Sequence, residues 1–178
     1  MAHSPMTNTD TRYKIRRMEL SDVAAVAAVH AQSFSRQLNS EEWILCNFRA
    51  YPRIRIFVAY ADNEIVGYIQ WTEKSGFRKE VVLELEQIAV LPESRNQGIG
   101  SNLINSSLSL VKEELATREA VLKHIIVTTR TDNSAQKIYR ETLNASAETT
   151  ISDLFSADEV IMIVRDISKQ KESKQWNQ

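Results

Sequence analysis

The apolar positions of this chain follow two different periods, and each period predicts one kind of element. A two-residue alternation, or a run of β-branched residues, predicts a strand, whereas a spacing of three to four residues predicts an amphipathic helix. Six segments have the first character: 13–18, 54–61, 64–71, 81–90, 122–129 and 160–164. Four segments have the second: 21–34, 39–50, 98–117 and 133–143.

The order of these elements predicts the sheet. The strands at 54–61 and 64–71 are separated only by Asp62 and Asn63, so we expect an antiparallel hairpin. The unit from Val81 to Thr129 has the order strand, helix, strand, and such crossovers are right-handed and join parallel strands. The expected fold class is therefore α/β (α+β mixed), with one mixed sheet and helices on both of its faces.

Length and composition limit the class of protein. At 178 residues the chain is expected to form one domain, placed at residues 12–167 between a flexible arm (1–11) and a disordered tail (168–178). The net charge of −1 argues against a dedicated nucleic-acid binder. No apolar run approaches the roughly 20 residues that cross a bilayer, and the polar start lacks the apolar core of a signal peptide. We therefore expect a cytoplasmic protein, with neither nucleic acid nor membrane as a partner.

The cysteine and histidine residues indicate no special chemistry. Cys46 is the only cysteine, which excludes an internal disulfide and fits a reducing compartment. Its apolar neighbours predict a buried, inert thiol. His3, His30 and His124 lack the spacing of metal ligands, so no metal site is expected.

The most informative segment lies between Glu84 and Ser101. It predicts a strand, then a turn that holds two of the chain's four glycines, then the start of the helix at 98–117. The first N–H groups of a helix have no partner within the helix and lie at the positive end of its dipole, so they bind phosphate well. Glu84 and Glu86 lie on the strand that leads into this turn. An anion site beside carboxylates on a rigid strand indicates an enzyme that uses a phosphate-bearing cosubstrate.

Three kinds of phosphate-binding loop can be compared with this turn. A P-loop needs a lysine after its last glycine, but Ser101 follows Gly100 here. A dinucleotide fingerprint needs three glycines in a tight turn, and only two are present. The third pattern, Arg/Gln-x-x-Gly-x-Gly/Ala, is matched by Arg-Asn-Gln-Gly-Ile-Gly at 95–100. This turn resembles the coenzyme A pyrophosphate loop of the GNAT superfamily of N-acetyltransferases.

The surrounding sequence extends this resemblance to nearly the whole of residues 13–164. The turn follows an Ile-Ala-Val run and a Pro-Glu pair, as in the family, and the hairpin at 57–68 looks like the family's second and third strands. Residues 132–139 resemble its Asn-x-x-Ala-x-x-x-Tyr helix. One departure is Leu143-Asn144, where family members often have Gly-Phe. Asn is the next-best residue for a left-handed helix end, so we expect this helix to end normally.

The resemblance implies a mostly antiparallel sheet of six or seven strands, with acetyl-CoA bound where two parallel strands splay apart. The pantetheine arm would pair with the strand backbone and with an asparagine, and the pyrophosphate would rest on the N–H groups of the turn. The cofactor-binding residues so implied are Ile88, Ala89, Val90, Arg95, Asn96, Gln97, Gly98, Ile99, Gly100, Ser101 and Asn133.

Acetyl transfer to an amine needs a base for the ammonium, a donor for the oxyanion and an acid for the departing thiolate. Glu84 and Glu86 share one face of their strand by the two-residue period, and the resemblance implies that one of them is the base, directly or through water. It also implies that Tyr139 is the general acid and that a backbone N–H near Val90 holds the oxyanion. Plainer interpretations stay open, with two solvated carboxylates and a tyrosine that packs on the core.

The function so implied is an acetyl-CoA-dependent N-acetyltransferase, in which a primary amine attacks directly in a ternary complex. The alternative is a non-catalytic acyl-CoA-binding sensor or interaction domain of the same fold. The acceptor stays open between a small-molecule amine and a protein or peptide amine, and homodimers are common in the family. A basic group at Arg49, Arg53 and Arg55 could attract an acidic acceptor, but we interpret it as a solvated face.

Overall fold

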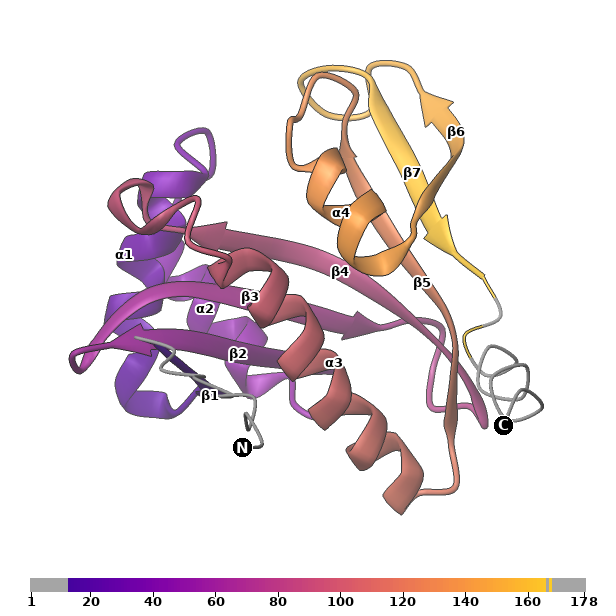
Figure 1. Ribbon diagram of the computed structural model, residues 1–178, viewed down its shortest axis with the longest axis horizontal. Coiled ribbons are helices and arrows are strands. Elements are labelled where there is room, and N and C mark those ends of the chain that lie inside the picture. The colour runs from indigo at the N-terminus through magenta and orange to yellow at the C-terminus, as the bar shows by residue number, and fades with distance from the viewer. Residues whose placement is uncertain (1–12, 166, 168–178) are drawn as a thin grey trace, which may run out of the picture.

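The computed structural model describes residues 13–165 and 167, so the expected arm (1–11) and tail (168–178) lie outside the described residues. Within the described part, seven strands form one sheet in the order β1-β2-β3-β4-β5-β7-β6. There β4 and β5 are the only parallel neighbours. Helices lie on both faces of the sheet (Figure 1). The expected α/β class, with a mostly antiparallel sheet and one parallel pair, is confirmed.

The elements have well-defined bounds. The strands are β1 (Lys14–Arg17), β2 (Ile54–Ala61), β3 (Glu64–Glu73), β4 (Glu80–Val90), β5 (Val121–Arg130), β6 (Ser146–Ile151) and β7 (Glu159–Val164). The α-helices are α1 (Val23–Ser33), α2 (Ser40–Arg49), α3 (Ile99–Thr117) and α4 (Gln136–Leu143). Two 3₁₀ turns, η1 (Leu20–Asp22) and η2 (Pro92–Ser94), come before α1 and α3. No helix in the described ranges is both long and apolar enough to cross a bilayer.

The hairpin between β2 and β3 forms where the sequence predicts it. Asp62 and Asn63 both have positive φ, at 48° and 66°, which is the backbone that a two-residue hairpin turn of this kind requires. Asp and Asn enter this left-handed region more easily than other residues with a Cβ. The sequence signal was therefore local, and the turn needs no tertiary contact to explain it.

Two elements differ from the prediction. Every residue of β6 is exposed, so its sequence lacks the apolar alternation of a half-buried strand, and it forms because β7 supplies backbone partners at the sheet edge. α4 begins at Gln136 rather than at Asn133, since Asn133 Oδ1 accepts the Ala135 N–H at 2.9 Å and holds the preceding turn. Its other end is as expected, because Asn144 is the left-handed C-cap with φ of 57°.

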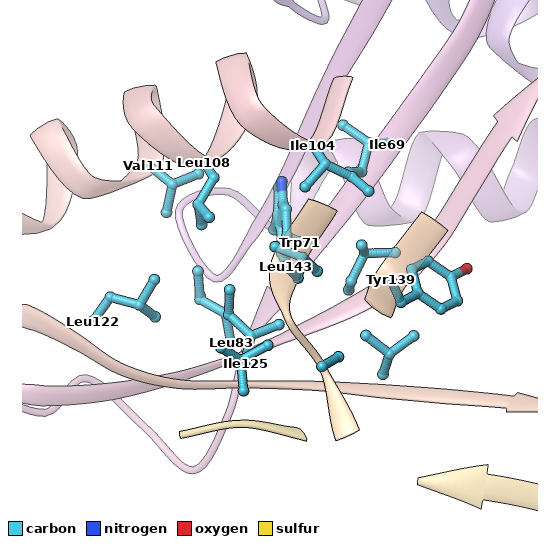
Figure 2. Packing of buried hydrophobic residues seen from close by; sticks show 14 of the residues in the cluster. Ile69, Trp71, Leu83, Ile104, Leu108, Val111, Leu122, Ile125, Tyr139 and Leu143 are labelled. Carbon is cyan, nitrogen blue, oxygen red and sulfur yellow. The ribbon is translucent and has the colours of Figure 1, made fainter. Parts of the chain in front are cut away.

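Two apolar clusters cover the two faces of the sheet. The first lies under α3 and α4 and includes Trp71, Leu83 and Ile104 (Figure 2). The second lies under α1 and α2 and includes Val26 and Ile44. The sheet is therefore buried on both sides by side chains from different helices, and the functional site must lie where these helices leave the strands uncovered.

A buried ion cluster fixes one end of β3. The Glu73 side chain is 1% exposed, and its carboxylate contacts the guanidinium groups of Arg55 and Arg118. The Arg55 side chain is 2% exposed and also donates from Nε to Glu114 at 2.9 Å. The expectation that Arg55 belongs to a solvated basic face is therefore wrong. A charged side chain is buried at low cost only where opposite charges and hydrogen bonds replace water, as they do here.

Replacing Glu73 with Gln should lower the free energy of unfolding by about 3 kcal/mol, because the buried guanidinium of Arg55 then loses one of its two charged partners and Arg118 loses its carboxylate. Urea unfolding followed by circular dichroism measures this. Glu80→Gln is the matched control, since Glu80 is 62% exposed and pairs with Lys123 in solvent. The control substitution should lower the free energy of unfolding by less than about 1 kcal/mol. Equal losses in the two variants would contradict the role given to the buried cluster.

Candidate active site

The candidate site lies where β4 and β5 separate. The parallel ladder between them runs from Glu80 and Val121 to Glu84 and Ile126, where it ends. Beyond that point β4 pairs only with β3 as far as Val90, and β5 pairs only with β7. A wedge therefore opens between the two strands (Figure 1).

A cavity of about 590 Å³ occupies this wedge. Its lining comes from the end of β4, the glycine turn, the first turn of α3, the end of β5 and the start of α4. It includes Glu86, Tyr139 and every residue predicted to bind the cofactor except Gln97. Glu84 is not part of it. The structure thus brings together nearly all the residues that the sequence singled out from four separate segments.

Beyond Glu84, the β4 edge that faces the wedge has no strand partner among the described residues. The Leu91 N–H donates to the Val66 carbonyl of β3 at 2.8 Å. Successive residues of a strand direct their N–H and C=O groups to opposite edges. The backbone groups of Ala89 therefore also point toward β3, whereas those of Ile88 and Val90 point toward the wedge. The ladder to β5 has ended here. An extended ligand can therefore pair with Ile88 and with the Val90 N–H as a neighbouring strand would, while the Val90 carbonyl accepts from Arg95.

The glycine turn exposes the start of α3. Gly98 is the N-cap of α3 with φ of 77°, a backbone that glycine adopts without strain. No side chain caps this helix, so its first N–H groups lack a side-chain partner. Gly100 has a different role, because a Cβ there would lie 2.8 Å from Ile138 Cδ1 of α4. The two glycines therefore leave the helix N-terminus open to the cavity and let α4 pack beside it.

The charged residue of the turn ties it to β4. Arg95 Nε donates to the Val90 carbonyl at 2.9 Å, and Arg95 lines the cavity. Asn96 also lines the cavity and has φ of 59°. Gln97 instead donates from its amide to the Glu93 carbonyl at 3.4 Å and lies outside the lining. Of the turn residues that have a side chain, Gln97 alone directs it away from the cavity.

A β-bulge in β4 sets the position of Glu86. The register between β3 and β4 shifts between Gln70 and Trp71, which leaves Glu86 without a partner in β3. Such a bulge inserts one residue, bends the strand and re-aims a side chain. It occurs just beyond the point where β4 leaves β5, and Glu86 lines the cavity. Nothing in the local sequence marked this irregularity.

The two candidate carboxylates have different surroundings. Glu84 accepts hydrogen bonds from Lys74 Nζ at 2.8 Å and from Thr128 Oγ1 at 3.1 Å, so both of its oxygens have partners. Glu86 is exposed and accepts from the Thr72 hydroxyl through one oxygen. Within the described residues its second oxygen has no partner. Glu86 is therefore the carboxylate that can receive a group from the cavity.

Tyr139 packs on the core and presents its hydroxyl to the cavity. Its ring is buried at the edge of the cluster under α3, with the hydroxyl directed away from Leu143 and Trp71 (Figure 2). The hydroxyl has no hydrogen-bond partner among the described residues. Burial raises the pKa of Tyr139 to about 12, so the phenol is protonated at neutral pH. Both interpretations of Tyr139, core residue and proton donor, are compatible with this position.

Asn133 lies in the turn before α4 and lines the cavity. Its Oδ1 accepts the Ala135 N–H at 2.9 Å, and its Nδ2 donates to Thr129 Oγ1 at 2.8 Å. One N–H of the amide remains for a ligand. Counted back from the tyrosine, the asparagine of the family pattern falls on Asp132, whose carboxylate is held by a neighbouring arginine. The amide that lines the wedge is therefore one residue from the position that the pattern specifies.

Gln87 is a buried residue of β4 that the sequence analysis missed. Its Oε1 accepts from Tyr68 Oη at 2.9 Å and from Trp43 Nε1 at 3.2 Å, and its Nε2 donates to Gln37 Oε1 at 3.1 Å. Gln37 Oε1 also lies 2.8 Å from His30 Nε2, and burial lowers the pKa of His30. These bonds join β3, β4, α1, α2 and the segment between the two helices. The only sequence signal for Gln87 was a single amide within a strand. Its hydrogen-bond partners lie at distant sequence positions, so the sequence did not reveal them.

Two segments that are distant in sequence border the α1 side of the wedge. Ser33 and Phe34, at the end of α1, line the cavity. Arg36 Nη1 donates to Ser156 Oγ, in the connection between β6 and β7, at 2.9 Å. Phe155, in the same connection, is 75% exposed. The hydrogen bond from Arg36 joins the connection that follows α1, which borders the cavity, to the connection between β6 and β7.

Known proteins resemble this chain in sequence and in fold. A sequence model described as "Acetyltransferase (GNAT) family" matches residues 23–144. A curated N-alpha-acetyltransferase from Sulfurisphaera tokodaii is 28% identical over 118 residues, which are 62% of this chain and 70% of that protein.

Solved structures share the fold. Ard1 from Thermoplasma volcanium has a TM-score of 0.69 at 21% identity, covering 88% of this chain and 99% of that one. The ribosomal-protein-S18-alanine N-acetyltransferase from Escherichia coli has a TM-score of 0.67 at 19% identity, covering 86% and 94%. A chain of the NatC complex bound to Gag peptide and CoA has a TM-score of 0.71 at 13% identity, covering 87% and 99%.

The family model covers more than half of the chain and extends from α1 to the end of α4. It includes both strands of the wedge, the glycine turn and the tyrosine helix. Together with the shared fold, this match shows that the chain belongs to the acetyltransferase (GNAT) family.

Proposed function

We propose that this protein transfers the acetyl group of acetyl-CoA to the N-terminal amine of a polypeptide, by direct attack within a ternary complex. The observation that carries the proposal is the wedge, whose lining combines a free strand edge, an uncapped helix N-terminus, a carboxylate and a protonated phenol. The N-terminal amine as acceptor is supported by the curated relative, which is an N-alpha-acetyltransferase.

The donor would be held mainly by backbone. Ile88 and Val90 would pair with the amide groups of the pantetheine arm, as argued from the strand geometry. The N–H groups at the start of α3 would bind the pyrophosphate, and Arg95 would add a positive charge beside it. The sulfur would then lie deep in the wedge, between Glu86 and Tyr139.

The chemistry would divide between three groups. Glu86 would take a proton from the acceptor ammonium, directly or through water, and the free amine would then form its bond to the acetyl carbon. The N–H of Val90 or Ile88 would stabilise the charge on the acetyl oxygen. As the carbon–sulfur bond breaks, the Tyr139 hydroxyl would give its proton to the thiolate and regain one from solvent. A phenol with a pKa of about 12 is protonated across the physiological range, so it is always ready to donate.

Thiol release from acetyl-CoA tests the function. We expect release with short peptides that carry a free N-terminus, and none with the same peptides blocked by N-terminal acetylation. Polyamines, aminoglycosides and free lysine form the comparison panel, and mass spectrometry locates the added acetyl group. Release with a small amine but with no peptide would contradict the polypeptide acceptor. Tight acetyl-CoA binding in calorimetry without release for any acceptor would favour the non-catalytic sensor instead.

Replacing Glu86 with Gln should lower kcat by about a hundredfold or more, since an amide cannot accept the ammonium proton. The dissociation constant for acetyl-CoA, measured by calorimetry, should change less than about twofold, because the donor is held by backbone groups. Glu84→Gln is the matched variant, and its kcat should fall less than about tenfold, because Glu84 lies outside the lining with both oxygens engaged. The opposite order of the two losses would make Glu84 the base.

Replacing Tyr139 with Phe should lower kcat at least tenfold, as expected for loss of a general acid. The free energy of unfolding should change by less than about 1 kcal/mol, because the hydroxyl has no hydrogen-bond partner to lose in residues 13–165 or at 167. In the unaltered protein, kcat should show no loss from phenol ionisation up to about pH 11, since the pKa of Tyr139 is raised to about 12. Full activity of the Phe variant would make Tyr139 a packing residue only.

A further inference from the structure

A second hollow lies on the sheet face that carries Glu84, on the other side of the point where β4 and β5 join. Its volume is about 750 Å³. Val82 of β4 and Ile126 of β5 form an apolar floor, and both are half-buried. Its wall includes the connection between β3 and β4, which lies at the opposite end of β4 from the glycine turn (Figure 1). We call this hollow the basic groove.

The walls of the basic groove carry four cations, Lys74, Arg78, Lys79 and Lys123, against one carboxylate, Glu80. Lys123 Nζ lies 3.0 Å from Glu80, so that pair is neutral. Arg78 Nε donates to the Ser75 carbonyl at 2.9 Å, which fixes the guanidinium plane. Within the described residues neither Arg78 nor Lys79 has a carboxylate partner.

Two successive side-chain contacts connect the basic groove with the cavity of the wedge. Lys74 lines the groove, and its Nζ lies 2.8 Å from Glu84. Glu84 accepts from Thr128 Oγ1 at 3.1 Å, and Thr128 lines the cavity. The groove and the candidate active site are therefore separated by a single ion pair on a common face of β4 and β5.

The spacing fits an extended polypeptide. A strand rises about 3.3 Å per residue, so the six residue steps from Glu86 to Glu80 along β4 span roughly 20 Å. An extended acceptor peptide that has its amine at Glu86 and runs along this face of β4 also advances about 3.3 Å per residue. Its third to sixth residues would then lie over Lys74, Arg78 and Lys79. The first two residues would remain in the wedge, where the amine must be.

We propose that the basic groove binds acidic side chains at about the third to sixth positions of the acceptor polypeptide, and so selects acceptors by charge. The inference rests on the proposed function, because it assigns the groove to the same acceptor. The chain as a whole has a net charge of −1, so the unpaired cations of the groove do not reflect a generally basic surface. A local excess of one sign beside an active site steers and holds ligands of the opposite sign.

Peptides that are identical at the first two positions and carry Glu, Gln or Lys at positions three to six test this inference. At low salt, kcat/KM for the Glu peptide should exceed that for the Gln peptide by roughly three- to tenfold, as expected for two or three exposed ion pairs. The Lys peptide should be the poorest. The preference should shrink as salt rises toward 0.5 M, because exposed charges are screened.

The double substitution Arg78→Glu and Lys79→Glu should reduce the ratio between the Glu and Gln peptides to about one or below. Lys14→Glu is the matched control, since Lys14 is an exposed cation on β1, three strands away from β4 in the sheet. The control should keep the full preference. Equal kcat/KM for the three peptides, or a preference that survives the double substitution, would overturn the inference.

Fluorescence anisotropy with labelled peptides separates this inference from the proposed function. If no peptide is acetylated, the proposed function fails. The inference about the groove still holds if the Glu peptide binds more tightly than the Gln peptide and this difference depends on Arg78 and Lys79. Equal binding of the Glu and Gln peptides overturns it. A short single-stranded RNA that displaces the Glu peptide at a lower concentration than unlabelled Glu peptide would also overturn it, since the groove would then be a nucleic-acid site.

Discussion

The end of the parallel ladder between β4 and β5 is the constraint on which the site depends. Backbone N–H and C=O groups are normally paired, and a ladder that continued past Glu84 and Ile126 would have closed the wedge. Instead β4 is held by β3 and β5 is held by β7, so the two strands are drawn apart. α3 and α4 fill the space on one face with apolar side chains, which keeps the opening rigid. The free edge of β4 is then available to a ligand rather than to a neighbouring strand.

The two faces of the sheet differ in polarity at this opening. On the α3 and α4 side, the cluster that includes Tyr139 is almost wholly apolar, and the uncapped N-terminus of α3 lies beside it. On the other side, Glu84 and Glu86 lie on a polar face, and Glu84 is joined to the basic groove through Lys74. Under the proposed function, a phosphate-bearing donor and an amine acceptor would approach from opposite sides and meet within the wedge. The β-bulge at Glu86 matters because it directs a carboxylate into this cavity.

Features with local signals were predictable from the sequence. The hairpin turn at Asp62 and Asn63, the left-handed helix end at Asn144 and the glycine N-cap at Gly98 all depend on backbone angles that few residue types adopt. Features that depend on distant partners were missed or wrong. Arg55 is buried because Glu73 and Glu114 surround it, and β6 is a strand only because β7 lies beside it.

The sequence by itself determined most of the elements, the glycine turn and a set of candidate residues that could carry chemistry, because periodicity and turn geometry act over a few neighbouring residues. Only the tertiary structure decided how those residues are used. It placed Glu86 in the cavity and Glu84 in an ion pair with Lys74, although the two are alike in sequence and lie two residues apart. The register shift, the burial and the distant partners that distinguish them arise from contacts between strands, which no local pattern encodes.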